Sequence, residues 1–166
     1  MRTVYKIMVA FNFSSYAEEA LAYGAKLAEA LGASLTIINV ISQLNVSVIQ
    51  KAAIYNSTIS FKDQVKRTRE DRITRINQHI EEHNMAHLPI KILIMTGTPF
   101  EEIIKAVESD KIDLVIMGPK GPTRVPNTPY ESTTEKMFCH CPVPIMSLCS
   151  SHKMETEERL PGRESA

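Results

Sequence analysis

The sequence predicts a doubly wound α/β domain, in which helices cover both faces of a parallel sheet. Short apolar runs rich in Val, Ile and Leu alternate along the chain with longer stretches whose apolar residues recur at helical spacing. The apolar runs are hydrophobic almost throughout, as expected for strands buried on both faces. With 166 residues the chain is long enough for one domain with a substantial core and too short for two. Strand–helix alternation of this kind gives right-handed crossovers and a parallel sheet.

The first unit is a strand over residues 5–11 followed by a helix. Ser15 and Glu18 have the spacing of a capping box at the start of this helix, and Gly32 is placed to end it. The many small residues between them let the helix lie close against a sheet. A second apolar run, residues 34–41, is predicted as the next strand.

Residues 42–60 show no regular period. They are polar with scattered apolar residues, and this apolar content is too high for a solvated linker. We therefore expect an irregular surface lid inserted at this point. Residues 61–84 then form a long amphipathic helix, whose charged outer face is expected to be solvated and internally paired rather than a nucleic-acid surface.

The second half of the chain repeats the alternation. Thr98 is placed as an N-cap, Pro99 stands at the first helical position and Glu101 completes a capping box. The remaining predicted elements are strands at 89–95, 113–117 and 143–148 and a helix at 131–140. We expect one domain over residues 1–149 and a flexible polar tail over 150–166.

Composition excludes several classes of protein. Lys+Arg and Asp+Glu both number 19, so the formal net charge is zero and there is no basic field for nucleic acid. Neither a signal core at the N-terminus nor an apolar run of membrane-spanning length occurs in the sequence. Three cysteines do not suggest a disulfide framework. The expectation is a cytoplasmic protein that binds neither membrane nor nucleic acid.

Five short motifs, in order along the chain, resemble the universal stress protein family. They are Lys6-Ile-Met-Val-Ala-Phe-Asn-Phe-Ser-Ser, Leu31-Gly-Ala-Ser-Leu-Thr-Ile-Ile-Asn-Val40, Gly97-Thr-Pro, Asp113-Leu-Val-Ile-Met-Gly and Pro142-Val-Pro-Ile. The resemblance covers the chain from Tyr5 to about Leu148. It implies a Rossmann-like, five-stranded parallel sheet of order 3-2-1-4-5. Ligands in such sheets bind beyond the carboxyl ends of the strands where the order reverses, here between the first and fourth strands.

The resemblance also implies a nucleotide-binding loop, which this chain matches in part. Gly118 and Gly121 match the family's first two glycines, and the spacing of nine residues to position 131 matches too. Glu131 stands where the third glycine belongs, and Asn12 replaces the family's first-strand aspartate. The set of residues implied to contact a nucleotide is Ala10, Asn12, Val40, Gly118, Lys120, Gly121, Ser132 and Thr133.

The departures from the family pattern weaken a phosphate site. Glu131 brings a carboxylate to a helix N-terminus, where it can satisfy the donors that a phosphate would use. Pro119 and Pro122 each remove a backbone donor. Asn12 lacks the charge that strengthens a hydrogen bond to a ribose hydroxyl. We therefore expect no resident cofactor. The alternative is that the crevice binds ATP or AMP with Mg²⁺; Lys120 and Arg124 would then attract the phosphates, and the metal ion would mask the charge of Glu131.

The histidines and cysteines are the other candidates for a site. His79, His83 and His87 recur at i, i+4 spacing, and we interpret them as a solvated stripe rather than a metal site because no carboxylate joins them at ligand spacing. Cys139 and Cys141 are too close in sequence to close a metal shell, so packing near a helix end is the better interpretation. No base can be named for any nucleophile, so an enzyme is not expected, although slow ATP hydrolysis is a weaker alternative.

The sequence therefore predicts a small cytoplasmic stress-response regulatory protein with a degenerate nucleotide-binding loop. The family resemblance implies a homodimer through the fifth strand, using Val143, Ile145, Met146 and Leu148, together with an unknown protein partner. An apolar edge strand is a template for such pairing. The alternative function is an ATP- or AMP-binding stress sensor that uses the Gly118–Gly121 loop and the Ser132 turn.

Overall fold

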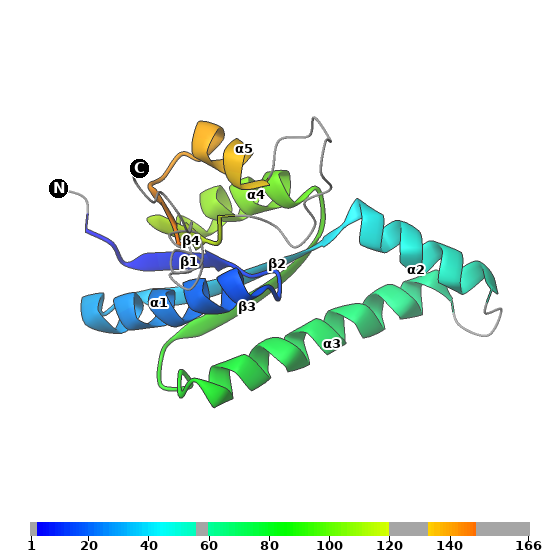
Figure 1. Cartoon of the computed structure of the whole chain (residues 1–166), viewed down its shortest axis with the longest axis horizontal. Helices are drawn as coiled ribbons and strands as arrows, with labels where there is room; N and C mark the ends of the chain where they lie inside the picture. Colours follow the sequence, from blue (N-terminus) through cyan, green and yellow to red (C-terminus); the bar gives the residue numbers. More distant parts are fainter. Residues whose placement is uncertain (1–2, 56–59, 120–132, 149–166) are drawn as a thin grey trace, which may run out of the picture.

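A computed structural model describes residues 3–55, 60–119 and 133–148. Five strands form one all-parallel sheet in the order β3-β2-β1-β4-β5 (Figure 1). The strands are β1 (Lys6–Ala10), β2 (Ser34–Ser42), β3 (Ile90–Gly97), β4 (Leu114–Met117) and β5 (Ile145–Ser147). The predicted fold class and strand order are confirmed.

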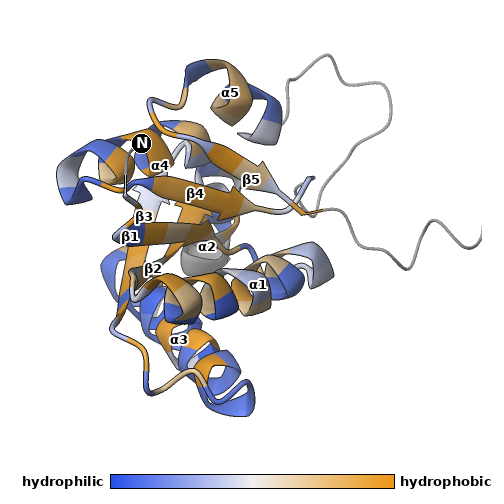
Figure 2. Cartoon of the chain, turned by 90° about the vertical axis from the view of Figure 1, so that its left-hand side faces the viewer, coloured by the Kyte–Doolittle hydropathy of each residue, from blue (hydrophilic) through white to orange (hydrophobic). Residues whose placement is uncertain are grey.

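Helices cover both faces of this sheet. α1 (Ser15–Leu31) and α3 (Phe61–Glu82) lie on one face, and α4 (Pro99–Asp110) and α5 (Thr133–His140) lie on the other (Figure 1). Each of these helices turns an apolar side towards the sheet and a polar side away from it, which Figure 2 shows by colour. The sheet thus divides the hydrophobic core into two halves, one beneath each layer of helices.

The alternation of side chains along β1 builds these two halves. Ile7 and Val9 pack against α1 and α3, whereas Met8 points to the side of α4 and α5, and all three are 0% exposed. Burying an aliphatic side chain of this size stabilises the fold by about 1.5–3 kcal/mol. The apolar runs in the sequence are continuous because both faces of the sheet are covered.

The start of α1 differs from the sequence prediction by one residue. Ser14, not Ser15, is the N-cap, and its Oγ accepts a hydrogen bond from the backbone N–H of Ala17 at 3.2 Å. Ser14 adopts the extended conformation that a cap needs because Asn12 Oδ1 accepts from both its N–H and its hydroxyl. The predicted capping box of Ser15 and Glu18 is wrong. At the other end Gly32 closes the helix with φ 63°, as predicted.

The segment expected to be an irregular lid is largely helical. Residues 43–55 form α2 (Gln43–Tyr55), so the prediction of irregular structure over 42–60 is wrong for this part; residues 56–59 lie outside the described residues. α2 follows β2 and packs along α3 rather than across the face of the sheet (Figure 1). The sequence of this segment shows no regular apolar period, so periodicity alone does not reveal the helix.

Two further details correct the sequence prediction. Thr98 is the N-cap of α4, but its side chain makes no capping hydrogen bond, so no capping box forms with Glu101. β5 spans Ile145–Ser147 rather than the predicted 143–148, because Pro144 has no N–H to donate and pairing begins at its carbonyl, which accepts from Val115 N. In the described ranges no helix has the length and hydrophobicity needed to cross a membrane.

Candidate functional site

The expected ligand crevice lies where the strand order reverses, at the carboxyl ends of β1 and β4. Ala10 ends β1 opposite Met117, Asn12 follows β1, and Gly118 follows β4. The end of β2, which carries Val40, lies beside them. Lys120, Gly121, Glu131 and Ser132 lie outside the described residues, so the loop that connects Gly118 to α5 is not described here.

The N-terminus of α5 also reaches this edge. Thr133 is the first residue of α5, and the hydroxyl of its neighbour Thr134 donates to the carbonyl oxygen of Gly118 at 3.2 Å. Thr134 is buried. The two ends of the connecting loop are therefore held together at the crevice, and the structure brings Ala10, Asn12, Gly118 and Thr133 to one edge of the sheet.

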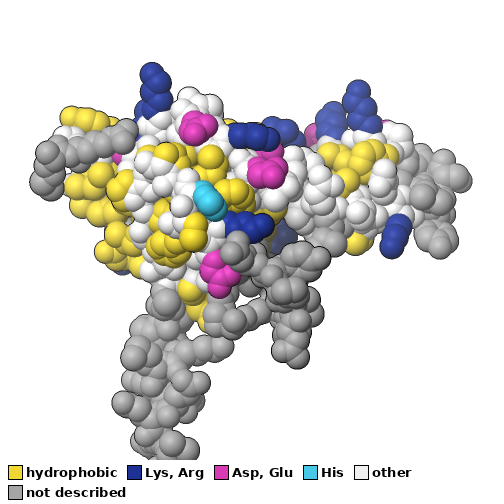
Figure 3. All heavy atoms as spheres, turned by 90° about the horizontal axis from the view of Figure 1, so that it is seen from above, with side chains coloured by type: hydrophobic (Ala, Val, Ile, Leu, Met, Phe, Trp, Pro, Cys, Tyr) yellow, Lys and Arg dark blue, Asp and Glu magenta, His cyan; other side chains and the backbone are white. Residues whose placement is uncertain are grey.

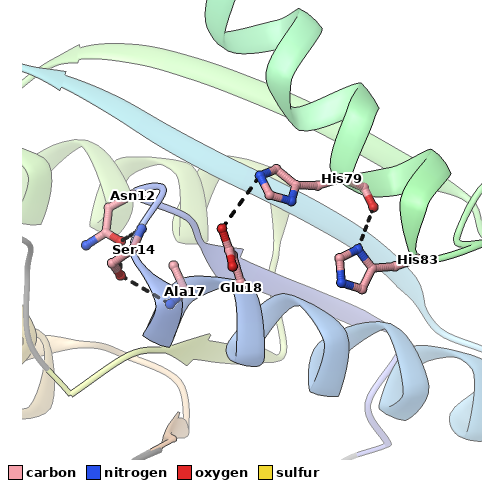
Figure 4. Close-up of polar contacts among 6 residues, drawn as sticks. All are labelled: Asn12, Ser14, Ala17, Glu18, His79 and His83. Carbon is pink, nitrogen blue, oxygen red and sulfur yellow. Dashed lines mark hydrogen bonds and ion pairs between the residues drawn. The ribbon is translucent and has the colours of Figure 1, made fainter.

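Asn12 uses its side-chain oxygen within its own turn. Oδ1 accepts from the backbone N–H of Ser14 at 3.1 Å and from its hydroxyl at 2.6 Å, as Figure 4 shows. This turn sets the start of α1. In the part of the chain that the structure describes, the acceptor expected to face a ribose is thus already engaged.

Val40 is engaged by a residue that the sequence did not single out. Arg72 of α3 donates from Nη1 to the carbonyl oxygen of Val40 at 3.2 Å and to Oδ1 of Asn39. The amide of Asn39, which is 3% exposed, donates in turn to the carbonyl oxygen of Phe11 at 2.6 Å. Burial lowers the pKa of the Arg72 guanidinium, although an arginine remains protonated near neutrality. This network ties α3 and β2 to the β1–α1 loop beside the crevice.

Arg72 was missed because the sequence places it among other basic residues on a helix expected to be solvated. The only usable signal was Asn39, a polar residue inside an otherwise apolar run. A buried side-chain amide needs hydrogen-bond partners, so it points to a nearby donor and acceptor. Nothing in a single sequence says that the donor comes from residue 72.

Gly118 is required by packing. A Cβ at this position would lie 2.8 Å from Cβ of Tyr16 and 3.4 Å from its carbonyl carbon. The end of β4 therefore approaches the first turn of α1 more closely than any side chain allows. The glycine that matches the nucleotide-binding pattern has a structural reason that does not involve a phosphate.

The three histidines separate into two groups. His87 interacts with Glu29 of α1, with Nε2 at 3.2 Å from Oε1. His79 and His83 lie with Glu82, and one potential ligand atom from each lies within 4.8 Å of the others. The expectation that no carboxylate joins the histidines at ligand spacing is wrong, because Glu82 is three residues after His79.

The cysteines differ in exposure. Cys139 is exposed, whereas Cys141 is half-buried just after the end of α5. Burial raises the pKa of the Cys141 thiol, and a hydrogen bond from the backbone of Val143 opposes this shift in part. This thiol is less nucleophilic at neutral pH than an ordinary one, which fits packing rather than redox chemistry.

The fold and the crevice define a class: a five-stranded doubly wound α/β protein with its candidate ligand site at the β1–β4 switch point. The family model for the universal stress protein family matches residues 4–147. The chain belongs to the universal stress protein family.

Relatives agree with this assignment. Universal stress protein MJ0577 of Methanocaldococcus jannaschii is 24% identical over 149 residues, which cover 85% of this chain and 92% of that protein. The solved structure of MJ0577 superposes with a TM-score of 0.71 at 21% identity, covering 89% of this chain and 96% of that one.

Two solved relatives are described as nucleotide complexes. One is a universal stress protein in complex with cAMP, with a TM-score of 0.58 at 15% identity, covering 89% of this chain and 98% of that one. The other is the universal stress protein from Archaeoglobus fulgidus in complex with dAMP, with a TM-score of 0.57 at 11% identity, covering 88% and 98%. At these identities the likeness to solved structures concerns the fold.

Proposed function

We propose that this protein is a small cytoplasmic stress-response regulator that acts by protein contact, and that its crevice does not hold a nucleotide tightly. One observation carries the proposal: Oδ1 of Asn12 is already occupied by two donors of Ser14. Val40 supports it, because its carbonyl oxygen already accepts from Arg72. A nucleotide that used Oδ1 of Asn12 would have to replace the two bonds from Ser14, each with a net value of about 0.5–1.5 kcal/mol.

The proposed partner surface begins with the edge of the sheet. β5 pairs only with β4 among the described strands. The N–H of Leu148 donates to β4, and the carbonyl oxygen of Pro144 accepts from β4. Successive residues of a strand point their backbone groups to opposite sides, so the N–H and C=O groups of Ile145 and Ser147 point to the outer edge of the sheet. Unpaired groups on an edge strand are a template for a second copy of the chain. We propose the homodimer here, with half-buried Val143, Ile145, Met146 and Leu148 contributing side chains.

A second surface lies next to this edge. Figure 3 shows the side of the molecule that carries α4 and α5, where hydrophobic side chains gather in groups between charged ones. Phe138 of α5 is 56% exposed. Aromatic residues with this exposure are common in protein interfaces, which supports a protein partner on this side.

Two measurements test the proposal. Calorimetric titration of untagged protein with AMP, cAMP or ATP with Mg²⁺ is expected to give no saturable binding in the micromolar range, and micromolar affinity would overturn it. Sedimentation at increasing protein concentration is expected to show a dimer that Ser147→Pro weakens, because proline removes an outward N–H without touching the ladder to β4. A variant that dimerises like the wild type would exclude this edge.

The second candidate function is an AMP- or ATP-binding stress sensor. It is favoured by the bond from Thr134 to Gly118, which brings the N–H groups of the first turn of α5 to the crevice, and by the relatives described as cAMP and dAMP complexes. If the carboxylate of Glu131 competes with phosphate, Glu131→Gly tightens nucleotide binding. Equal or absent binding in both forms would count against the sensor.

A further inference from the structure

We propose that His79, Glu82 and His83 of α3, joined by Glu18 of α1, form a site for a divalent transition metal, with zinc the best match. The site lies between the two helices that cover one face of the sheet. It is independent of the crevice, and it does not rest on the function proposed above.

The spacing of the three α3 residues places their side chains together. Residues at i, i+3 and i+4 share one face of a helix. The ligand atoms of His79, Glu82 and His83 lie within 4.8 Å of one another. Two imidazoles at i, i+4 on a helix form the same chelating pair that zinc proteases use in the H-E-x-x-H motif.

His83 has the outer hydrogen bond that is typical of a metal ligand. Its Nδ1 lies 2.9 Å from the carbonyl oxygen of His79, and in the tautomer that donates this bond the lone pair is on Nε2 (Figure 4). Metal-ligating histidines commonly donate their other ring N–H to a backbone carbonyl or a carboxylate, which fixes the tautomer and the orientation of the ring. Nε2 of His83 is therefore prepared to coordinate.

His79 is held in place by its neighbours. Its ring packs edge-on against Phe11 with the centroids 5.3 Å apart, and its Nδ1 is buried. Nε2 of His79 points towards Glu18 and away from the ring of His83 in Figure 4. Nδ1 has no hydrogen-bond partner among the described residues, and one of the two rings has to turn before both histidines can hold the same ion.

Glu18 of α1 is the candidate for a fourth ligand from a different helix, next to the three α3 residues whose ligand atoms lie within 4.8 Å of one another. Its Oε1 lies 3.9 Å from Nε2 of His79, which is too long for a hydrogen bond. Ligand atoms about 2.0–2.1 Å from a tetrahedral zinc ion are separated by roughly 3.3 Å, so the Glu18 side chain has to move closer to His79 and to the other two ligands when the ion binds.

The donor set selects the class of metal. Two imidazole nitrogens and carboxylate oxygens suit zinc and its first-row neighbours, whereas Mg²⁺ and Ca²⁺ prefer shells made of oxygen alone. A zinc ion would link α1 to α3 across this face. A ligand that binds the folded state and not the unfolded state raises the melting temperature, so the link has a measurable consequence.

The test is calorimetric titration of untagged, reduced, full-length protein with ZnCl₂, together with thermal melts with and without zinc. The wild type is expected to bind one ion per chain, with no matching signal from MgCl₂. His83→Ala is expected to weaken binding by about tenfold or more and to abolish the zinc-induced rise in melting temperature. Glu18→Gln is expected to reduce that rise because the link between the helices is lost.

Two matched controls make the outcome decisive. His87→Ala removes a histidine that is exposed near the same helix end and is paired with Glu29, and it is expected to bind zinc like the wild type. Cys139→Ser removes an exposed thiol and is also expected to leave binding unchanged. Unchanged affinity in His83→Ala, or loss of binding in Cys139→Ser, would overturn the proposal. Metal-free melts of each variant separate lost binding from lost folding.

Discussion

Replacing Gly118 by alanine tests whether this glycine serves packing or an anion. The new Cβ would lie 2.8 Å from Cβ of Tyr16. Carbon atoms in ordinary contact are about 3.5–4.0 Å apart, so the two must separate by roughly 0.7 Å or more. The obstructing atom is attached directly to the backbone of α1, so a simple side-chain rotation cannot relieve the clash.

The cost of Gly118→Ala follows from this geometry. Overpacking a tight contact costs about 1–3 kcal/mol, and a less flexible unfolded chain returns about 0.4–1 kcal/mol. The middle of these two ranges leaves an expected net loss of about 1.3 kcal/mol, which lowers the melting temperature by roughly 3–5 °C in a domain of this size. The assay is a thermal melt followed by circular dichroism in the absence of any nucleotide.

A rescue experiment separates the clash from other effects of the added methyl group. Tyr16→Gly removes the Cβ that Gly118→Ala would meet. The double variant is expected to be less destabilised than the sum of the single variants, because the two changes share one contact. An unchanged melting temperature for Gly118→Ala would refute the packing explanation. Anion binding would then be the remaining explanation for the glycine.

Three further predictions concern single contacts of Ser14, Arg72 and Cys141, which lie on different faces of the sheet. Ser14→Ala is expected to cost about 1 kcal/mol in a denaturant melt, whereas Ser15→Ala is expected to be nearly neutral; the reverse order would restore the predicted capping box. Arg72→Ala is expected to cost about 1–3 kcal/mol, because the Oδ1 of buried Asn39 loses its donor, and a stability equal to that of the wild type would show that water replaces it. Alkylation of the Cys141 thiol can be followed by mass spectrometry of the peptide that contains it. Burial raises the pKa of this thiol, so the rate of alkylation is expected to rise only above the pH at which ordinary thiols ionise. A rapid reaction at neutral pH would contradict this.

The sequence predicts the fold well because the physics of the strands is local. Runs such as residues 34–41 are mainly apolar, and such runs are typical of parallel strands that are buried on both faces. Gly32 predicts the end of α1, because a C-cap in the left-handed conformation favours glycine. The start of α1 was harder, since Ser14 and Ser15 are equally good caps by type and only the turn made by Asn12 selects the first.

The site was less predictable because its contacts join distant parts of the chain. The bond between Arg72 and Val40 spans 32 residues, and no local pattern encodes it. The 43–55 helix was missed because its residues show no helical period, and its position beside α3 is a contact that the sequence does not reveal. The sequence links Gly118 only to the family's nucleotide-binding pattern, whereas the packing reason for a glycine, the approach of Tyr16, is visible only in three dimensions.

Amide NMR of uniformly labelled protein, titrated with ATP and Mg²⁺ and separately with AMP, tests most directly whether the crevice is satisfied by the chain's own bonds. The signals of the Asn12 side chain and the Val40 and Gly118 backbones are expected to stay in place up to millimolar nucleotide. Saturable shifts of these three signals at micromolar nucleotide would contradict that result and show that the crevice is a working nucleotide site.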